Sequence, residues 1–227
     1  MCRRPAAAEG SPAVKSLFTT LRRGFGAGLR SAWDELMPPL CPLCRAVPKP
    51  PGACACDRCT EAMGTLPAPR CPQCGGACDG ALAVCSDCLR GDARPWLQAV
   101  SAFPFRGLTR EAVHRLKYKG DTALVPLFAA AMAADWRRYG HGELDVVVPV
   151  PLFWTRQLLR GYNQAELLAR MVARQLGLPC ERLLRRRRRT AQQARLDRAA
   201  RQANVRGVFA SRCGLRAAGR RVLLVDD

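Results

Sequence analysis

Eight of the 13 cysteines in this 227-residue chain form four C-x-x-C pairs, a spacing typical of zinc ligands. The pairs are Cys41 with Cys44, Cys56 with Cys59, Cys71 with Cys74, and Cys85 with Cys88. Each C-x-x-C turn offers two thiolates to one ion, and a second turn completes a tetrahedral site with no open position. The sequence therefore predicts two structural Zn²⁺ ions, with consecutive or interleaved pairs sharing each ion.

The two halves of this cysteine region repeat one another at nearly equal spacing, which indicates duplication of a small zinc ribbon. Cys54 and Cys78 lie near enough in sequence to replace a neighbouring ligand, whereas Cys2, Cys180 and Cys213 are isolated and expected to be inert. Redox-active dithiols are a poor alternative because thioredoxin-type pairs do not occur in tandem.

A second candidate site combines two carboxylates with arginines. Asp226 and Asp227 follow one apolar run, and Arg156 and Arg160 follow another at residues 145–149. In open α/β sheets, ligands bind beyond the carboxyl ends of the strands. Carboxylates suit ribose hydroxyls or Mg²⁺, and arginines suit phosphates, so a sugar phosphate would fit. The alternative is that the two aspartates only end a strand in solvent.

A dense basic segment is the third feature, and its arginines are Arg182, Arg185 to Arg189, Arg195, Arg198, Arg201 and Arg206. They are interpreted either as a solvated surface or as contacts to phosphates of a sugar or of single-stranded DNA. Aromatic residues are missing nearby in the sequence, which argues against a base-stacking platform. The net charge of +19, about +15 with two tetrathiolate zinc sites, attracts phosphate-bearing partners of any kind.

The elements that must position these residues follow from periodicity and punctuation. Runs without alternation at 145–149 and 221–227 predict parallel strands buried on both faces, and residues 97–105 predict another strand. Helices are predicted at 109–118, 124–136 and 163–176. Alternating strands and helices predict an α/β fold with an open sheet.

The last predicted helix has the clearest boundaries. Asn163 is its expected N-cap, Glu166 occupies the capping-box position, and Gly177 ends it. His114, on an earlier helix, is interpreted as a packed residue rather than a general base.

Residues 1–37 form an Ala/Gly/Arg-rich leader with apolar residues at helical spacing. We expect an amphipathic helix that packs on the next module, with a membrane-surface or transit-like role as the alternative. No apolar run reaches ~18 residues, so no membrane span is expected. With reduced metal-binding cysteines and no export signal, the sequence predicts a cytoplasmic protein.

Several short motifs occur in an order that resembles the ComF family, in which a cysteine zinc module precedes a type I phosphoribosyltransferase domain. The segment from Val222 to Asp227 looks like the opening of the motif that binds phosphoribosyl pyrophosphate (PRPP). The other matching motifs are residues 114–120 (HRLKYKG), 148–151 (VPVP), 160–164 (RGYNQ), 189–193 (RTAQQ) and 204–209 (NVRGVF). The resemblance covers the chain from about residue 36 onward.

This resemblance implies a double zinc ribbon at 38–92 and a phosphoribosyltransferase-like domain at 93–227. It also implies site residues: Asp226 and Asp227 for the ribose hydroxyls; Val150, Arg156, Arg160 and Lys117 for PRPP and its pyrophosphate; and a flap over 185–206 with Arg189, Thr190 and Gln193. The implied substrate is PRPP, or another phosphorylated sugar, with Mg²⁺.

The implied reaction transfers the phosphoribosyl group to a nitrogen nucleophile. The family name links it to natural competence, so single-stranded DNA and competence-machinery proteins are the implied partners. The alternative is a non-catalytic zinc-ribbon adaptor that handles single-stranded DNA.

The chain departs from the family pattern at its end. In the family pattern, a Thr/Gly-rich loop that holds the 5-phosphate follows the two carboxylates, whereas this sequence stops at Asp227. We therefore expect a domain incomplete at its C-terminus and inactive as it stands, with a fragment of a longer reading frame favoured over a genuine truncation.

Overall fold

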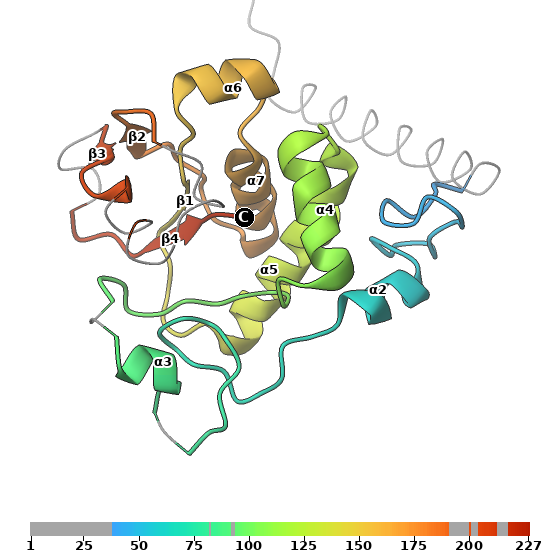
Figure 1. The fold of residues 1–227 in the computed structure, drawn as a ribbon, viewed down its shortest axis with the longest axis horizontal. Helices are drawn as coiled ribbons and strands as arrows, with labels where there is room; N and C mark the ends of the chain where they lie inside the picture. The colour runs from blue at the N-terminus through green and yellow to red at the C-terminus, as the bar shows by residue number, and fades with distance from the viewer. Residues whose placement is uncertain (1–37, 82, 92–93, 191–199, 201–203, 213–217) are drawn as a thin grey trace, which may run out of the picture.

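A computed structural model describes residues 38–81, 83–91, 94–190, 200, 204–212 and 218–227. The predicted leader helix lies outside these residues. Elements occur in the order α2 (Asp57–Met63), α3 (Ser86–Leu89), α4 (Gly107–Tyr118), the 3₁₀ turn η1 (Thr122–Leu124), α5 (Val125–Tyr139), β1 (Val146–Pro149), α6 (Trp154–Arg160), α7 (Gln164–Leu176), β2 (Leu184–Arg186), β3 (Phe209–Ser211) and β4 (Val222–Val225) (Figure 1).

Strands β1 and β4 are parallel neighbours, with Val146 opposite Val222 and Pro149 opposite Val225. The parallel pairing of both predicted strands is thus confirmed, but burial on both faces is wrong for β4, because Val222 and Leu224 are exposed. On the other side of β1 the chain near Cys180 continues the sheet through a parallel bridge to Val147. All four β1 residues are buried, which explains why apolar residues do not alternate along it.

The two faces of β1 contribute to different parts of the core. Val147 belongs to the main cluster, together with Leu116 of α4, Phe128 of α5 and Leu168 of α7. Val146 and Val148 point the other way and pack with residues 183 and 184, at the start of the β2–β3 hairpin. Helices α4, α5 and α7 therefore cover one face of the sheet, and the hairpin region covers the other (Figure 1).

The predicted helices are confirmed as α4, α5 and α7, and α6 is a further helix that was not predicted from the sequence. Helix α7 begins as predicted, because Asn163 Oδ1 accepts a 3.1 Å hydrogen bond from Ala165 N–H. It ends at Gly177, whose φ of 71° is left-handed. The capping-box role of Glu166 is wrong, since its carboxylate accepts from Arg170 and Arg182 instead.

The strand predicted at 97–105 is also wrong, because this segment uses its polar groups against the second cysteine region. Ala99 N–H donates to Pro72 O at 2.8 Å, and Ser101 O accepts from Arg70 at 2.9 Å. Phe103 packs edge-on against Phe128 of α5. With its main chain paired to a loop, the segment does not join the sheet.

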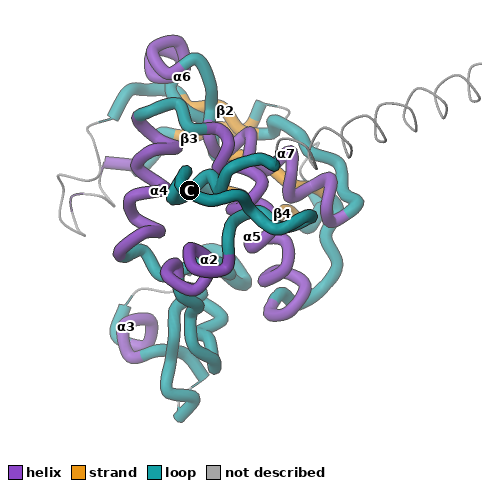
Figure 2. Tube along the Cα trace, turned by 90° about the vertical axis from the view of Figure 1, so that its right-hand side faces the viewer, coloured by secondary structure: helices purple, strands orange, loops and turns teal. Residues whose placement is uncertain are grey.

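The α/β class is confirmed: two cysteine tetrads come first along the chain, and helices with a parallel sheet follow them. The first cysteine region includes α2, and this helix packs against α4. The second, with α3, forms the lower end of the molecule in the rotated view (Figure 2). No helix in the described part of the chain is long and apolar enough to cross a membrane.

Candidate functional site

The first metal centre consists of Cys41, Cys44, Cys56 and Cys59, whose Sγ atoms lie within 4.8 Å of one another. The first pair sits in a turn closed by a 2.8 Å hydrogen bond from Arg45 N–H to Cys41 O. The second pair is positioned by α2, because Cys56 is the N-cap of this helix and Cys59 lies in its first turn.

The second centre repeats this arrangement with Cys71, Cys74, Cys85 and Cys88. Here Cys85 precedes α3, and Cys88 lies in that helix. Gly75 follows the first pair with φ of 72°, and a Cβ there would stand 2.8 Å from Ser101 N, so only glycine fits. Consecutive pairs combine in both centres, which answers the question that the spacing left open.

The geometry of both centres fits tetrahedral zinc. Zn–S bonds of about 2.3 Å place two sulfurs about 3.8 Å apart. Cys44 Sγ lies 3.9 Å from Cys56 Sγ, and Cys74 Sγ lies 3.7 Å from Cys85 Sγ. Since protein supplies four ligands, each centre can hold one structural zinc ion.

Electrostatics favour ionisation of Cys41 and Cys44 in the first centre and of Cys71 in the second, and oppose ionisation of other members of each tetrad. Burial opposes ionisation of Cys41, but nearby main-chain N–H groups, that of Cys56 foremost, lower its pKa to about 6. The same arrangement lowers the pKa of Cys71 to about 6. Burial and the neighbouring thiols raise the pKa of Cys59 and of Cys74 to about 12. A bound divalent cation would offset this mutual repulsion.

The remaining described cysteines lie outside both tetrads. Cys78 Sγ donates to Pro69 O at 3.4 Å, and Cys54 packs against the core. Cys180 lies beside β1, where burial raises the pKa of its thiol.

A cavity of about 1060 Å³ opens beyond the carboxyl ends of β1 and β4. All described residues predicted for the sugar-phosphate site line it: Lys117, Val150, Arg156, Arg160, Arg189, Thr190, Asp226 and Asp227. Gln193 lies outside the described residues. The lining also includes Tyr118, Asn163, Gln164, Arg186 and Phe209. Side chains separated widely in sequence thus meet where an α/β sheet binds ligands.

The two aspartates and a lysine form the acidic side of the cavity. Lys117 Nζ lies 3.3 Å from Asp227 Oδ1, and the Asp227 side chain is only 7 % exposed. Asp226 keeps an exposed surface but is enclosed by protein on its inner side. This loss of hydration, together with the charge of Asp227, raises the pKa of Asp226 to about 6.

Two arginines and a threonine form the basic side. Thr190 is buried, its carbonyl accepts a 2.7 Å hydrogen bond from Arg156, and its hydroxyl accepts one from Arg186. Burial and the neighbouring Arg156 lower the pKa of Arg186. Two cations held this close favour an anion between or beside them.

The loop after β1 forms the wall between these two sides. Val150 N–H donates to Val225 O, and Val150 O accepts from Asn163 Nδ2, each at 3.0 Å. Both main-chain polar groups of Val150 therefore form hydrogen bonds within the protein, and Val150 contributes to the wall of the cavity. Asn163 both caps α7 and fixes this loop, so the sequence signal for a helix start also marked a residue of the site.

Sequence reasoning missed Arg186 and Gln164 as site residues. Arg186 Nε and Gln164 Oε1 are buried in the cavity wall and have no hydrogen-bond partner among the described residues. Unpaired buried polar atoms in a cavity wall are typical of a ligand or water site. The sequence did not distinguish Arg186 from its neighbours in a run of five arginines; the structure places Arg186 and Arg189 in the cavity wall.

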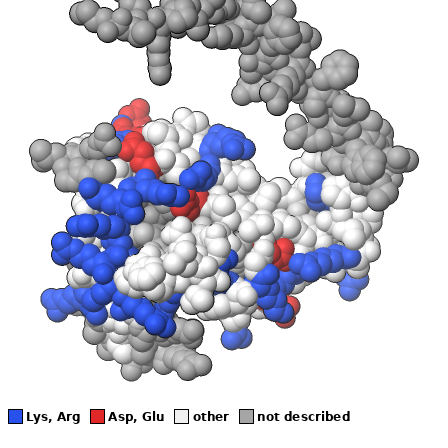
Figure 3. Space-filling view, turned by 90° about the horizontal axis from the view of Figure 1, so that it is seen from above, with Lys and Arg blue, Asp and Glu red and all other residues white. Residues whose placement is uncertain are grey.

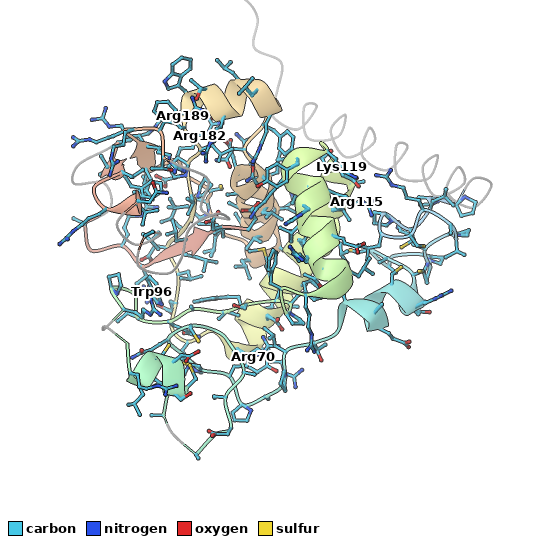
Figure 4. All side chains as sticks on the ribbon, in the orientation of Figure 1. Arg70, Trp96, Arg115, Lys119, Arg182 and Arg189 are labelled. Carbon is cyan, nitrogen blue, oxygen red and sulfur yellow. The ribbon has the colours of Figure 1, made fainter. Side chains whose placement is uncertain are left out.

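Exposed arginines, among them Arg182, Arg185 and Arg212, form a basic surface over α6, β2 and β3 (Figure 3). Arg182, Arg185 and Arg212 line a second cavity of about 370 Å³ together with Trp154 of α6, which is 62 % exposed. Figure 4 labels Arg182 and Arg189 near α6 and β2, and Arg189 also lines the larger cavity. The argument from sequence against a base-stacking platform therefore does not hold, because the fold brings Trp154 beside the basic segment.

The interpretation of His114 as a packed residue is wrong, because this residue is exposed; two aromatic rings lie beside it. Its ring centroid lies 6.3 Å from that of Phe105 and 5.8 Å from that of Tyr118. Tyr118 in turn lies under the Arg160 guanidinium, 5.1 Å from its ring centroid, at the mouth of the cavity.

Comparison with known proteins finds relatives along most of the chain. The DNA utilization protein YhgH of Escherichia coli (strain K12) is 31% identical over 200 residues, covering 84% of this chain and 85% of the relative. Competence protein ComFC of Bacillus subtilis (strain 168) is 30% identical over 133 residues, covering 56% and 55%. Competence protein F of Haemophilus influenzae (strain Rd) is 28% identical over 178 residues, covering 76% of each. No family model and no solved structure matches.

Proposed function

The chain belongs to the ComF family, and from that premise and the cavity at the ends of β1 and β4 we propose that it is a phosphoribosyltransferase-like protein that binds PRPP with Mg²⁺. Its cellular role would be in the use of incoming DNA, as the names of its relatives suggest. The two zinc centres would be structural supports of this domain.

One observation carries the proposal: an acidic pair and an arginine pair line the same cavity. Asp226 and Asp227 stand at the end of β4, while Arg156 and Arg186 meet at Thr190. A sugar phosphate has hydroxyls at one end and anionic oxygens at another, and this cavity offers a partner for each. Its volume of about 1060 Å³ lies just above the usual range of small-molecule sites, which ends at about 1,000 Å³.

Each group of residues has a distinct role in this proposal. Asp226 and Asp227 would accept hydrogen bonds from the ribose hydroxyls, and as hard oxygen donors they also suit Mg²⁺. Arg156, Arg186 and Arg189 would hold the pyrophosphate. Bound Mg²⁺ would supply neutralisation of the phosphate charge.

In the proposed reaction a nitrogen nucleophile attacks C1 of the ribose. The N–C1 bond forms and the C1–O bond to pyrophosphate breaks, with the electron pair leaving on the pyrophosphate oxygen. The nitrogen loses a proton to water or to a nearby base. The arginines stabilise the negative charge that develops on the leaving group.

A calorimetric titration of Mg·PRPP tests this proposal. The proteins are the 227-residue chain and the same chain continued past Asp227 by the Thr/Gly-rich loop that the resemblance leads us to expect. We expect micromolar binding to the continued chain, lost when Asp226 and Asp227 are both replaced by Asn.

Asp145→Asn is the matched control, because Asp145 pairs with Arg221 at the opposite end of the same two strands. It should leave the affinity unchanged. Absence of heat with both proteins, at concentrations up to the millimolar range, would overturn the proposal.

The exposed Trp154 beside outward arginines supports a second candidate function, binding of single-stranded DNA. Aromatic rings stack on bases and arginines contact the phosphates, so this surface offers both. In this reading the chain handles DNA strands without necessarily modifying them.

Fluorescence anisotropy with a labelled oligonucleotide separates the two functions. Affinity should fall steeply with salt and should drop about tenfold in Trp154→Ala. Trp96→Ala, which changes an exposed tryptophan near the second zinc centre, is the control and should bind as the wild type does. Equal affinity of both variants would remove DNA binding from this surface.

A further inference from the structure

The last turn of α4 stands between the first metal centre and the cavity. Arg115 leaves this helix toward the metal centre, and Lys117 leaves it toward the cavity. At 100° per residue, two positions along a helix differ by about 200°, so these side chains occupy opposite faces. Figure 4 shows Arg115 on the side of α4 that faces the first cysteine region.

Arg115 holds the loop that carries the first ligand pair. Its Nη1 donates to Leu43 O at 2.7 Å, and its Nη2 donates to Pro42 O. Its Nε donates to Asp121 at 2.9 Å, and that carboxylate, 6 % exposed, also accepts from Arg45 at 2.6 Å. Because Pro42 and Leu43 lie between two metal ligands, the position of Arg115 depends on how this loop is folded.

The opposite face of the same turn reaches the cavity. Lys117 pairs with Asp227 at 3.3 Å, and Tyr118 lies beneath Arg160. Leu116, between the two faces, is fully buried, and its carbonyl accepts a hydrogen bond from the Tyr162 hydroxyl. A shift of this turn would therefore displace the lysine from the carboxylate pair.

The second metal centre is held by a similar clamp in a different place. Arg70 immediately precedes Cys71, and it donates to Ser101 O and to Asp135 at 3.0 Å. Its guanidinium also lies 4.0 Å from the ring centroid of Tyr139, near the end of α5. The described residues that line the cavity include Lys117 and Tyr118 of α4 but none of α5, the helix to which the Arg70 clamp attaches.

We infer that Arg115 is a positioning residue: it couples metal loading of the first centre to Lys117 and so to the affinity of the cavity for a phosphate ligand. The second centre has no such coupling. The effect on affinity rests on the proposed function, whereas the effect on Lys117 does not.

Dimethyl-lysine NMR reads the coupling directly on the 227-residue chain. The chain contains only four lysines, so ¹³C-methylated side chains can be assigned by single Lys→Arg variants. Methylation keeps the positive charge. The Arg115→Gln variant should retain two zinc ions and should move the Lys117 signal toward that of the exposed Lys119. Arg70→Gln, also retaining two zinc ions, should leave the Lys117 signal in place.

Calorimetry with Mg·pyrophosphate supplies the second measurement. We expect Arg115→Gln to bind at least about fivefold more weakly than the wild type, and Arg70→Gln to bind equally. If wild type does not bind pyrophosphate, the proposed function fails, but the Lys117 signal still tests the coupling. An unmoved signal in Arg115→Gln, or an equal shift in Arg70→Gln, would overturn the inference.

Emptying each centre tests the same idea if Arg115→Gln does not fold. Cys44→Ala and Cys74→Ala change equivalent ligands of the two centres. The first should lose one zinc ion and shift the Lys117 signal, while the second should lose one zinc ion without that shift. Identical behaviour of these two variants would also refute the coupling.

Discussion

Lys117 and Asp227 meet as an ion pair on one side of the cavity, with Nζ 3.3 Å from Oδ1, although α4 and β4 come from distant parts of the chain. Among the described residues, Lys117 is the cation that forms an ion pair with this pair of carboxylates. Its charge also favours ionisation of Asp226, since it acts to lower the raised pKa of that group.

Removing this lysine should weaken the acidic side of the site. In Lys117→Met we expect the pKa of Asp226 to rise above about 6, because one stabilising charge is lost. Carboxyl ¹³C chemical shifts followed against pH measure it. Lys119→Met is the control, since Lys119 is exposed and does not line the cavity. A pKa that is the same in both variants would contradict this role for Lys117.

Ligand affinity should depend on pH through Asp226. Its folded-state pKa of about 6 exceeds the ordinary 3.8, so the folded protein binds this proton more tightly than the unfolded chain does. Protonation of this group therefore favours folding as pH falls from 6 toward 4, but it removes the carboxylate that the ligand needs. At pH 5 about one-tenth of Asp226 is ionised, and Mg·PRPP should bind about tenfold more weakly than at pH 7.5.

Calorimetric titrations of wild type and Asp226→Asn at both pH values check this prediction. The ionisation of the ligand itself is common to the two proteins and cancels in the comparison. A wild-type affinity that follows the same pH profile as the variant would show that Asp226 does not titrate in this range.

Zinc content should follow the two tetrads. We expect two zinc ions per chain, one in Cys59→Ser, and two again in Cys54→Ser and Cys78→Ser, because the latter residues lie outside the centres. Metal analysis after denaturation gives these values. Cys59→Ser should also be less stable, since metal binding contributes to folding. Loss of zinc in either control would mean that the ligand sets exchange members.

Arg186 and Arg187 are neighbours with different surroundings. Arg186 lines the cavity and Arg187 is exposed, so Arg186→Met should reduce affinity for Mg·pyrophosphate by tenfold or more, while Arg187→Met should change it less than twofold. Equal losses of pyrophosphate binding would mean that only overall charge matters.

Asn163 serves the helix and the site together. Asn163→Ala loses the cap of α7 and the 3.0 Å bond to Val150 O, and should lower the free energy of unfolding by about 1–2 kcal/mol. Asn163→Asp keeps the cap acceptor but cannot donate to Val150 O. Urea denaturation should therefore place it between Ala and wild type; an Asp variant as unstable as Ala would assign the whole effect to the loop.

The sequence by itself determined the features that depend on near neighbours. C-x-x-C spacing identified all eight ligands, because two thiolates in one turn are a local property. Apolar runs identified β1 and β4, and Asn163 and Gly177 marked the ends of α7. The aspartates at the end of β4 were identified for the same reason, since a strand determines where its next residues emerge.

Tertiary structure decided everything that joins distant segments. It paired consecutive cysteine turns, since both orders satisfy the same spacing. It drew residues 97–105 away from the sheet, because the second cysteine loop offered partners for their main-chain groups. It placed two of five adjacent arginines, Arg186 and Arg189, in the wall of the larger cavity and brought Trp154 beside Arg185. Such choices depend on which surfaces become buried together, and burial is a property of the folded chain as a whole.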